Sequence, residues 1–375
     1  MTTPPTLPGS GLPWYVRPAA RAWTCAPVPA DVRAFHAGLS GYAPTPLVEL
    51  PAIAALLSVG RAFVKDESTR MGLAAFKVLG ASWAVHQVLS RHQVLSRHPA
   101  GAELVLVTAS DGNHGRAVAR MARLFSQRAH VFVPSGVHPV AMAAIAAEGA
   151  RVTEITGTYD DAVRLAAEAA REPSAVLVQD TAWPGYEQVP GWIVEGYSTL
   201  FAEVDTQLAG ARAAGPGLVV VPVGVGSLAQ AAVTHYRSRP GEPAPALMSV
   251  EPEAAACVLA SLAGGELVSV PAGATVMAGL NCGTPSMLAW PYLRAGLDAA
   301  LAITDADSIA AAHELAGHGI PAGPCGAASL AGALAALTGE GADARRAALA
   351  IGPDTTVVLL STEGAAANPV PDAAG

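Results

Sequence analysis

Short runs of apolar residues alternate along this chain with longer, alanine-rich stretches in which apolar positions recur at helical spacing. The apolar runs predict strands at residues 61–65, 104–108, 129–133, 151–155, 175–178, 218–221, 246–250 and 356–360. The stretches between them predict helices at residues 74–98, 116–126, 139–148, 160–171, 191–208, 227–236, 308–317 and 326–337. Such alternation is typical of α/β proteins, in which helices cover both faces of a mostly parallel, twisted sheet.

The strand and helix signals form two series, which suggests two domains. A chain of 375 residues is long enough for both. We expect residues 79–182 to form a small α/β domain that is inserted into a larger domain made of residues 1–78 and 183–375.

A tandem duplication of the sequence HQVLSR interrupts the predicted helix 74–98, with its copies at residues 86–91 and 92–97. Six residues turn an α-helix by about 240°, so two copies in one straight helix present their apolar residues to different neighbours. We therefore expect one copy to be looped or frayed.

The composition narrows the class of protein. Hydrophobic residues make up 51% of the chain and charged residues 14%, which favours a well-buried core. The net charge of −8, without a dense Lys/Arg patch, argues against a nucleic-acid partner. The sequence has no basic segment followed by an apolar core at its amino terminus and no apolar run of about 18 residues, so we expect a cytoplasmic protein without a membrane segment.

The four cysteines, Cys25, Cys257, Cys282 and Cys325, lack the C-x-x-C spacing of zinc sites. No metal site is predicted. Whether Cys257 and Cys282 approach each other closely enough for a disulfide is left open, because sequence separation does not decide it.

Lys77 lies in an almost wholly apolar stretch, residues 71–81. Read alone, such a lysine is more often a surface residue whose apolar stem lies along the helix. Two polar turns further along the chain, each after a predicted strand, change that interpretation. Together with the lysine they suggest a carbonyl cofactor held as a Schiff base.

The first of these turns, residues 110–115, contains Asp111, Asn113 and His114. Asn113 can donate a hydrogen bond to a phenolate oxygen. Asp111 is as readily explained as a helix N-cap, and His114 as a structural hydrogen-bonding residue. Asp180 also follows a predicted strand, and as a lone aspartate it would more often form a turn.

The second turn, residues 222–230, joins a strand to a helix and contains Gly224, Val225, Gly226 and Ser227. Glycines allow backbone N–H groups to converge on an anion at a helix N-terminus, so phosphate is the expected ligand. A dinucleotide loop, with Glu251 as the ribose-binding acid, and a plain packing turn are the alternatives.

Two hydroxyl residues, Ser361 and Thr362, follow the last predicted strand. A hydroxyl beside a pyridine nitrogen makes a neutral hydrogen bond, and the weaker electron sink that results suits elimination of a good β leaving group. Both residues can equally be ordinary polar groups at a strand end.

Taken together, these segments resemble the fold-type II pyridoxal-phosphate enzymes, and among them the diaminopropionate ammonia-lyase family. The resemblance spans about residues 60–365. It rests on five blocks, which are residues 65–77, 110–116, 179–183, 277–285 and 360–364.

The resemblance implies a two-domain fold with pyridoxal 5'-phosphate as the cofactor and an amino acid as the substrate. Lys77 would carry the cofactor as an internal aldimine, Asn113 would contact its phenolic oxygen, and residues 224–227 would hold its phosphate. The family's two functional acids map to Asp111 and Asp180. The implied reaction converts 2,3-diaminopropionate, through an aminoacrylate, to pyruvate and ammonia.

The resemblance also implies a homodimer. Lys77 would be the base for one face of the substrate, and Asp111 for the other, so that both enantiomers react. The chain departs from the family at Ala74, where asparagine is common, and after Gly364, where an acidic cluster is usual.

Three other functions compete with this hypothesis. A serine/threonine dehydratase or β-substituting enzyme of the same fold would prefer a hydroxyl substrate, whereas Asp111 and Asp180 favour a diamine. A binding or regulatory protein could keep the fold without turnover, although Lys77, Asn113 and the glycine turn argue against this. A nicotinamide-dependent dehydrogenase would give Lys77 no role.

Overall fold

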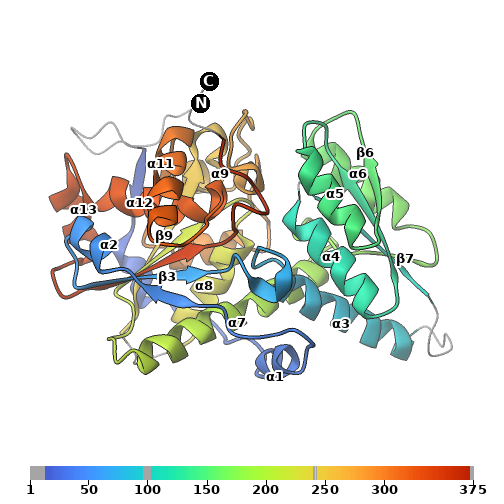
Figure 1. Cartoon of the computed structure of the whole chain (residues 1–375), viewed down its shortest axis with the longest axis horizontal. Coiled ribbons are helices and arrows are strands. Elements are labelled where there is room, and N and C mark those ends of the chain that lie inside the picture. The colour runs from blue at the N-terminus through green and yellow to red at the C-terminus, as the bar shows by residue number, and fades with distance from the viewer. Residues whose placement is uncertain (1–12, 96–102, 111, 240, 242, 372–375) are drawn as a thin grey trace.

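The strands of the protein form two separate sheets, as the computed structural model in Figure 1 shows. The structure describes residues 13–95, 103–110, 112–239, 241 and 243–371. No helix in these described ranges is both long and apolar enough to cross a membrane.

The larger sheet has seven strands in the order β1-β10-β9-β8-β11-β3-β2. Its five central strands run parallel, whereas β1 and β2 pair antiparallel at the two edges. The strands are β1 (Trp14–Val16), β2 (Leu47–Glu49), β3 (Arg61–Asp66), β8 (Leu218–Pro222), β9 (Ala246–Pro252), β10 (Ala299–Ile303) and β11 (Thr356–Ser361).

Helices cover both faces of this sheet, because alternate residues of a strand point to opposite sides. In β11, Val357 and Leu359 belong to a core cluster with the apolar residues of α11 and α12. Val358 and Leu360 belong to the cluster that contains α7 and α8. These four helices are α7 (Gln188–Gly210), α8 (Ser227–Arg237), α11 (Asp305–Gly317) and α12 (Pro324–Leu337).

The smaller sheet has four parallel strands in the order β6-β5-β4-β7. Leu106 of β4 packs in the cluster that contains α4 and α5, and Val107 packs against α6 on the opposite face. The elements are β4 (Val105–Ala109), β5 (Arg128–Val133), β6 (Arg151–Glu154), β7 (Ala175–Leu177), α4 (Asn113–Leu124), α5 (Pro139–Ala147) and α6 (Tyr159–Ala169).

Helix α3 (Val78–Leu95) joins the two sheets and packs closely on α7. A methyl group on Gly80 would lie 2.5 Å from Cε1 of Tyr197, and one on Gly196 would lie 2.4 Å from the carbonyl oxygen of Leu79. Only glycine allows this close approach. The remaining helices are α1 (Asp31–Ala37), α2 (Pro51–Leu56), α9 (Cys257–Gly264), α10 (Trp290–Gly296) and α13 (Ala342–Leu349), with 3-10 helices η1 (Pro18–Ala22), η2 (Arg70–Gly72), η3 (Glu253–Ala255) and η4 (Ala278–Leu280).

The predicted α/β class is confirmed, and each predicted strand and helix has a counterpart within a few residues. The predicted helix 74–98 instead begins at Val78, after Lys77. The first HQVLSR copy is helical, and so are residues 92–95 of the second, so no loop interrupts the repeat there; residues 96 and 97 lie outside the described part of the chain.

Candidate functional site

The site lies where the carboxyl ends of parallel strands from both sheets meet. Ser110 follows β4, Asp180 lies shortly after β7, Gly224 follows β8, and Thr362 follows β11. Ligands of open α/β sheets bind at such strand ends. The pocket is lined by Phe76, Lys77, Ser110, His114, Tyr159, Asp180, Tyr197, residues 222–228, Gly279, Leu280, Cys282 and Thr362.

Lys77 is the one lysine that this pocket can use. The whole sequence contains two lysines, Lys65 and Lys77. The ammonium of Lys65 is fully buried and donates to Glu203, to Gln207 and to the carbonyl oxygen of Thr45. The side chain of Lys77 is 21% exposed and lies in the turn that precedes α3.

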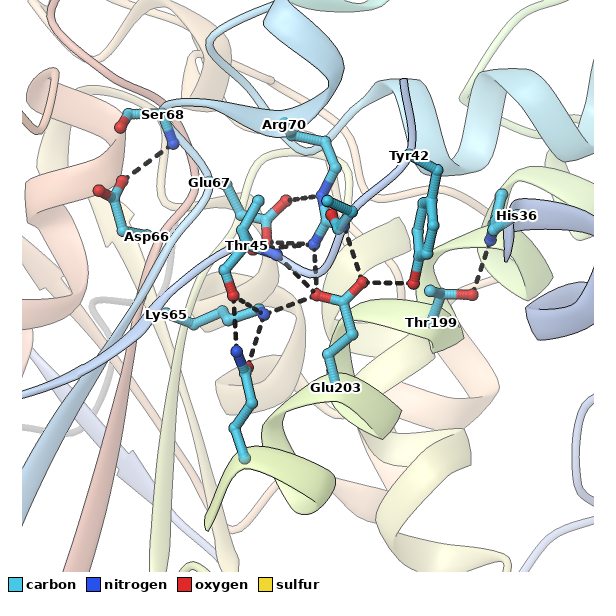
Figure 2. A network of polar contacts seen from close by, with 12 residues as sticks. His36, Tyr42, Thr45, Lys65, Asp66, Glu67, Ser68, Arg70, Thr199 and Glu203 are labelled. Carbon is cyan, nitrogen blue, oxygen red and sulfur yellow. Dashed lines mark hydrogen bonds and ion pairs between the residues drawn. The ribbon is translucent and has the colours of Figure 1, made fainter. Parts of the chain in front are cut away.

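The environment of Lys65 is a buried network of opposite charges, shown in Figure 2. One carboxylate oxygen of Glu203 lies 2.6 Å from Nζ of Lys65, and the same oxygen lies 2.7 Å from Nη2 of Arg70. Arg70 also binds Glu67, and Tyr42 donates to Glu203 at 2.8 Å. The charges of Lys65 and Arg70 balance those of Glu67 and Glu203. The network therefore anchors the segment before Lys77, and the ammonium of Lys65 is fully engaged in it.

Asp180 faces Lys77 directly, with Oδ2 2.5 Å from Nζ. Its other carboxylate oxygen accepts from the amide of Gln179 at 3.2 Å and from the hydroxyl of Tyr159 at 3.4 Å. Burial alone would raise the pKa of Asp180, but the positive charge of Lys77 and the hydrogen bond from its ammonium hold it well below its usual range. Asp180 is therefore ionised at neutral pH.

His114 is buried beside this pair, as a structural hydrogen-bonding residue. Its Nε2 lies 2.8 Å from the carbonyl oxygen of Val178, to which it donates, and its Nδ1 lies 3.9 Å from Asp180. Burial lowers the pKa of His114, with Lys77 acting in the same direction. The imidazole is therefore neutral at pH 7 and orients the segment that carries Asp180.

Two tyrosines of the pocket gave no signal in the sequence. Tyr159 opens α6, and its hydroxyl contacts both Gln179 and Asp180. Tyr197 lies on α7, and its hydroxyl is buried without a hydrogen-bond partner among the described residues. Both come from helices whose apolar spacing is ordinary, so only the folded arrangement identifies them.

The glycine turn after β8 leads into the first turn of α8, where backbone N–H groups have no partner within the helix. Gly226 has φ +100°, and a methyl group there would lie 2.6 Å from Leu293. A methyl group on Gly224 would lie 3.1 Å from Sγ of Cys282. The hydroxyl of Ser227 donates to the carbonyl oxygen of Asp180 at 3.0 Å. The turn is thus a small-residue cradle suited to an anion.

The alternative role of Glu251 as a ribose-binding acid does not fit the structure. Its carboxylate is fully buried and accepts the N–H groups of Val258 and Leu259, both at 2.7 Å, at the start of α9. Burial raises the pKa of Glu251 to about 8. The carboxylate of Glu251 therefore caps the start of α9, and Glu251 does not line the pocket at the glycine turn.

Asn113 opens α4, and its amide donates to Oε2 of Glu363 at 2.5 Å. Thr362 lines the pocket, whereas Oγ of Ser361 is buried with no hydrogen-bond partner among the described residues. These three predicted residues therefore gather at the end of β11, next to the pocket. Glu363 is a further polar residue there that the sequence did not single out.

Asp111 lies outside the described residues. Its predicted roles therefore stay predictions. Next to it, the hydroxyl of Ser110 accepts the N–H groups of Gly112 and Gly115 at 3.0 and 2.8 Å. No disulfide joins Cys257 to Cys282 or involves the other two cysteines in the described part of the chain. In the described part of the chain, no group of three or more His, Cys, Asp or Glu side chains could hold a metal ion.

Comparisons with known proteins agree with this geometry. A family model described as pyridoxal-phosphate dependent enzyme matches residues 39–363. The diaminopropionate ammonia-lyase of Salmonella typhimurium is 39% identical over 280 residues, which cover 70% of this chain and 69% of that protein. The Escherichia coli K12 protein of the same name is 36% identical over 352 residues, which cover 88% of this chain and 87% of that protein.

A solved structure shows the same fold. It is the diaminopropionate ammonia-lyase of Escherichia coli in complex with an aminoacrylate-PLP azomethine reaction intermediate. Its TM-score is 0.85 at 32% identity, and the match covers 95% of each chain.

Proposed function

We propose that the pocket eliminates ammonia from 2,3-diaminopropionate and yields pyruvate. The premise is the family, because the chain belongs to the pyridoxal-phosphate dependent enzymes and, within them, to the diaminopropionate ammonia-lyases. The observation that carries the proposal is the contact between Lys77 and Asp180. It places the one available lysine against a carboxylate that stays ionised.

The residues around the pocket fit pyridoxal phosphate. When bound, the cofactor supplies an aldehyde that joins to amines and a ring that takes up electrons from the Cα of an amino acid. Lys77 offers the amine, and the cradle of Gly224, Val225, Gly226 and Ser227 suits its phosphate. The buried hydroxyl of Ser361, which has no hydrogen-bond partner among the described residues, suits the ring nitrogen, with Thr362 beside it.

Asn113 is proposed to contact the phenolic oxygen of the cofactor. One hydrogen of its amide is used by Glu363, and an asparagine amide has a second to donate. The hydrogen bond to Glu363 would therefore orient the amide without consuming its capacity to bind the cofactor.

Lys77 would act twice. Its amine would hold the cofactor at rest, and with substrate in the pocket its Nζ would be the base that takes the Cα proton. Asp180 accepts a hydrogen bond from this nitrogen, so it keeps Nζ in position for both steps.

Asp180 is also proposed to select the diamine. The β-amino group of the substrate is protonated in water, so it arrives as a cation that can leave as ammonia without further protonation. An ionised carboxylate attracts that cation and gains nothing comparable from the neutral hydroxyl of serine. Asp111 would serve the second face of the substrate, as the resemblance implies.

A homodimer is proposed on the family resemblance alone, and a cytoplasmic location on the sequence signals alone. Sedimentation of the purified protein measures its oligomeric state, and a single species with the mass of one chain would contradict the homodimer.

The function is tested by measuring pyruvate from D- and L-2,3-diaminopropionate and from serine, with the protein saturated in pyridoxal phosphate. A higher kcat/KM for either enantiomer of the diamine than for serine is expected. Turnover of serine or threonine at a higher kcat/KM would move the substrate assignment to a dehydratase, and absence of turnover with a bound cofactor would favour a binding protein.

A further inference from the structure

Helix α4 carries three arginines that face one buried glutamate. Arg116, Arg120 and Arg123 lie on successive turns of the helix, and Glu148 follows the end of α5. The carboxylate of Glu148 is 5% exposed and lies 2.6 Å from Nε of Arg120, 2.9 Å from Nη2 of Arg123 and 3.6 Å from Nε of Arg116. These arginines outweigh the effect of burial and lower the pKa of Glu148, so it stays ionised.

Two of these arginines also reach the segment that leads to Lys77. Nη1 of Arg116 donates to the carbonyl oxygen of Leu73 at 3.1 Å, and Nη1 of Arg120 donates to that of Met71, also at 3.1 Å. Arg123 makes no such contact; its second donor approaches the carbonyl oxygen of Ala147. The helix that begins at Asn113 is therefore tied to the backbone just before Lys77.

That segment, residues 70–77, needs external support. Met71 and Ala74 have φ of +48° and +60°, which is unfavourable for residues with a side chain. The buried network holds one end at Arg70, and the other end is held by the N–H of Phe76, which donates to the carbonyl oxygen of Thr362 at 3.2 Å. Between these ends, the arginine contacts fix the carbonyl groups of the strained turn.

We propose that Arg120, oriented by Glu148, is a positioning residue for Lys77, with Arg116 in the same role. Arg120 uses two donors for Glu148 and a third for Met71. The planar guanidinium group, with its donors forked toward two partners, fixes the distances between α4, α5 and the segment 70–77. A change that keeps the charge but removes the fork should therefore displace Lys77 without unfolding the protein.

The experiment compares R120K with R123K. Both substitutions keep a positive charge beside Glu148, and they differ in that only Arg120 contacts the segment before Lys77. Cofactor-free protein is used to measure the midpoint of thermal unfolding and the dissociation constant for added pyridoxal phosphate. Protein saturated with pyridoxal phosphate is used to measure kcat and KM with 2,3-diaminopropionate.

Because a displacement of reacting groups by about 1 Å can cost a hundredfold in rate, we expect R120K to lower kcat roughly tenfold to a hundredfold with a smaller effect on KM. It should also weaken cofactor binding severalfold, whereas R123K should match the wild-type protein in both. Unfolding midpoints that differ little between the variants would show that stability is not the cause.

Equal behaviour of R120K and R123K at similar stability would overturn the inference. Should R120K not fold, R116K makes the same comparison through the contact with Leu73. The inference rests on the proposed function, and the two fail differently: wild-type protein that binds no pyridoxal phosphate contradicts the proposed function, whereas matching variants contradict only the positioning role.

Discussion

Nζ of Lys77 lies 2.5 Å from Oδ2 of Asp180, although the two residues are 103 positions apart in the sequence. Lys77 precedes the helix that leads out of the larger sheet, and Asp180 lies just after the last strand of the smaller one. The contact therefore links the two sheets at the pocket. It also places the ammonium of Lys77 beside a buried carboxylate, and such perturbed ionisable pairs in a pocket are common at functional sites.

Replacing Asp180 by asparagine should change the choice of substrate more than it changes the pocket. A hydrogen bond to a charged group contributes about 1.5–3 kcal/mol, so D180N should lower kcat/KM for 2,3-diaminopropionate roughly tenfold to a hundredfold more than it lowers that for serine. Pyruvate formation from both substrates measures the ratio. An equal loss with both substrates would show that Asp180 acts only through Lys77.

Replacing Asp111 by asparagine should reduce turnover of one enantiomer of the diamine and spare the other. The reason is that Lys77 and Asp111 are assigned to opposite faces of the substrate, and an amide is not a base. Separate rate measurements with the D and L forms test this. Unchanged rates for both would remove Asp111 from the reaction.

Glu203 should be critical for stability, because it balances Lys65 and Arg70 in the buried network of Figure 2. Removing one partner of a buried ion pair costs about 3–5 kcal/mol, so E203A should shift the urea unfolding midpoint strongly. The matched control is E49A, which breaks an ion pair with Arg61 at the surface. The account requires a much smaller shift for that control.

His36 should make the stability of the protein depend on pH. It is fully buried, with Nδ1 2.7 Å from the hydroxyl of Thr199 and Nε2 3.0 Å from the carbonyl oxygen of Leu79. Burial lowers its pKa to about 4, whereas an unfolded histidine titrates near 6.5. Between these values the unfolded chain binds the extra proton, so stability falls as the pH is lowered.

The contribution of His36 to this loss should be about 2 kcal/mol between pH 7 and pH 5. Urea unfolding at the two pH values measures it, with H36Q as the comparison. H36Q should be less stable than the wild type at pH 7 and should show a smaller loss on acidification. The same loss in both proteins would assign the effect to other groups.

The sequence predicted the central strands well, because runs such as residues 356–360 are apolar at every position and suit only a buried parallel strand. It missed β10, Ala299–Ile303, because three of its five residues are alanine and read as helix. The edge strands β1 and β2 were missed because three residues are too short for a pattern. The proposed domain limits, residues 79–182 within 1–78 and 183–375, stay a prediction.

The site was predicted in part for a similar reason. Asp180 and the glycine turn follow strands, so their convergence could be expected from strand order, whereas Lys77 lies in the turn before α3 and was found from its apolar surroundings. Tyr159 and Tyr197 come from helices and carry no such mark. The left-handed backbone at Ala74 was also invisible in the sequence, because alanine seldom adopts this conformation.

The role of Lys77 is tested most directly by reducing the protein with borohydride in the presence of pyridoxal phosphate and locating the added mass by peptide mapping. With two lysines in the chain, the outcome is unambiguous. We expect the modification on Lys77, none on the buried Lys65, and none in K77A. Modification of Lys65, or an unmodified Lys77 in protein that still forms pyruvate from the diamine, would contradict the account.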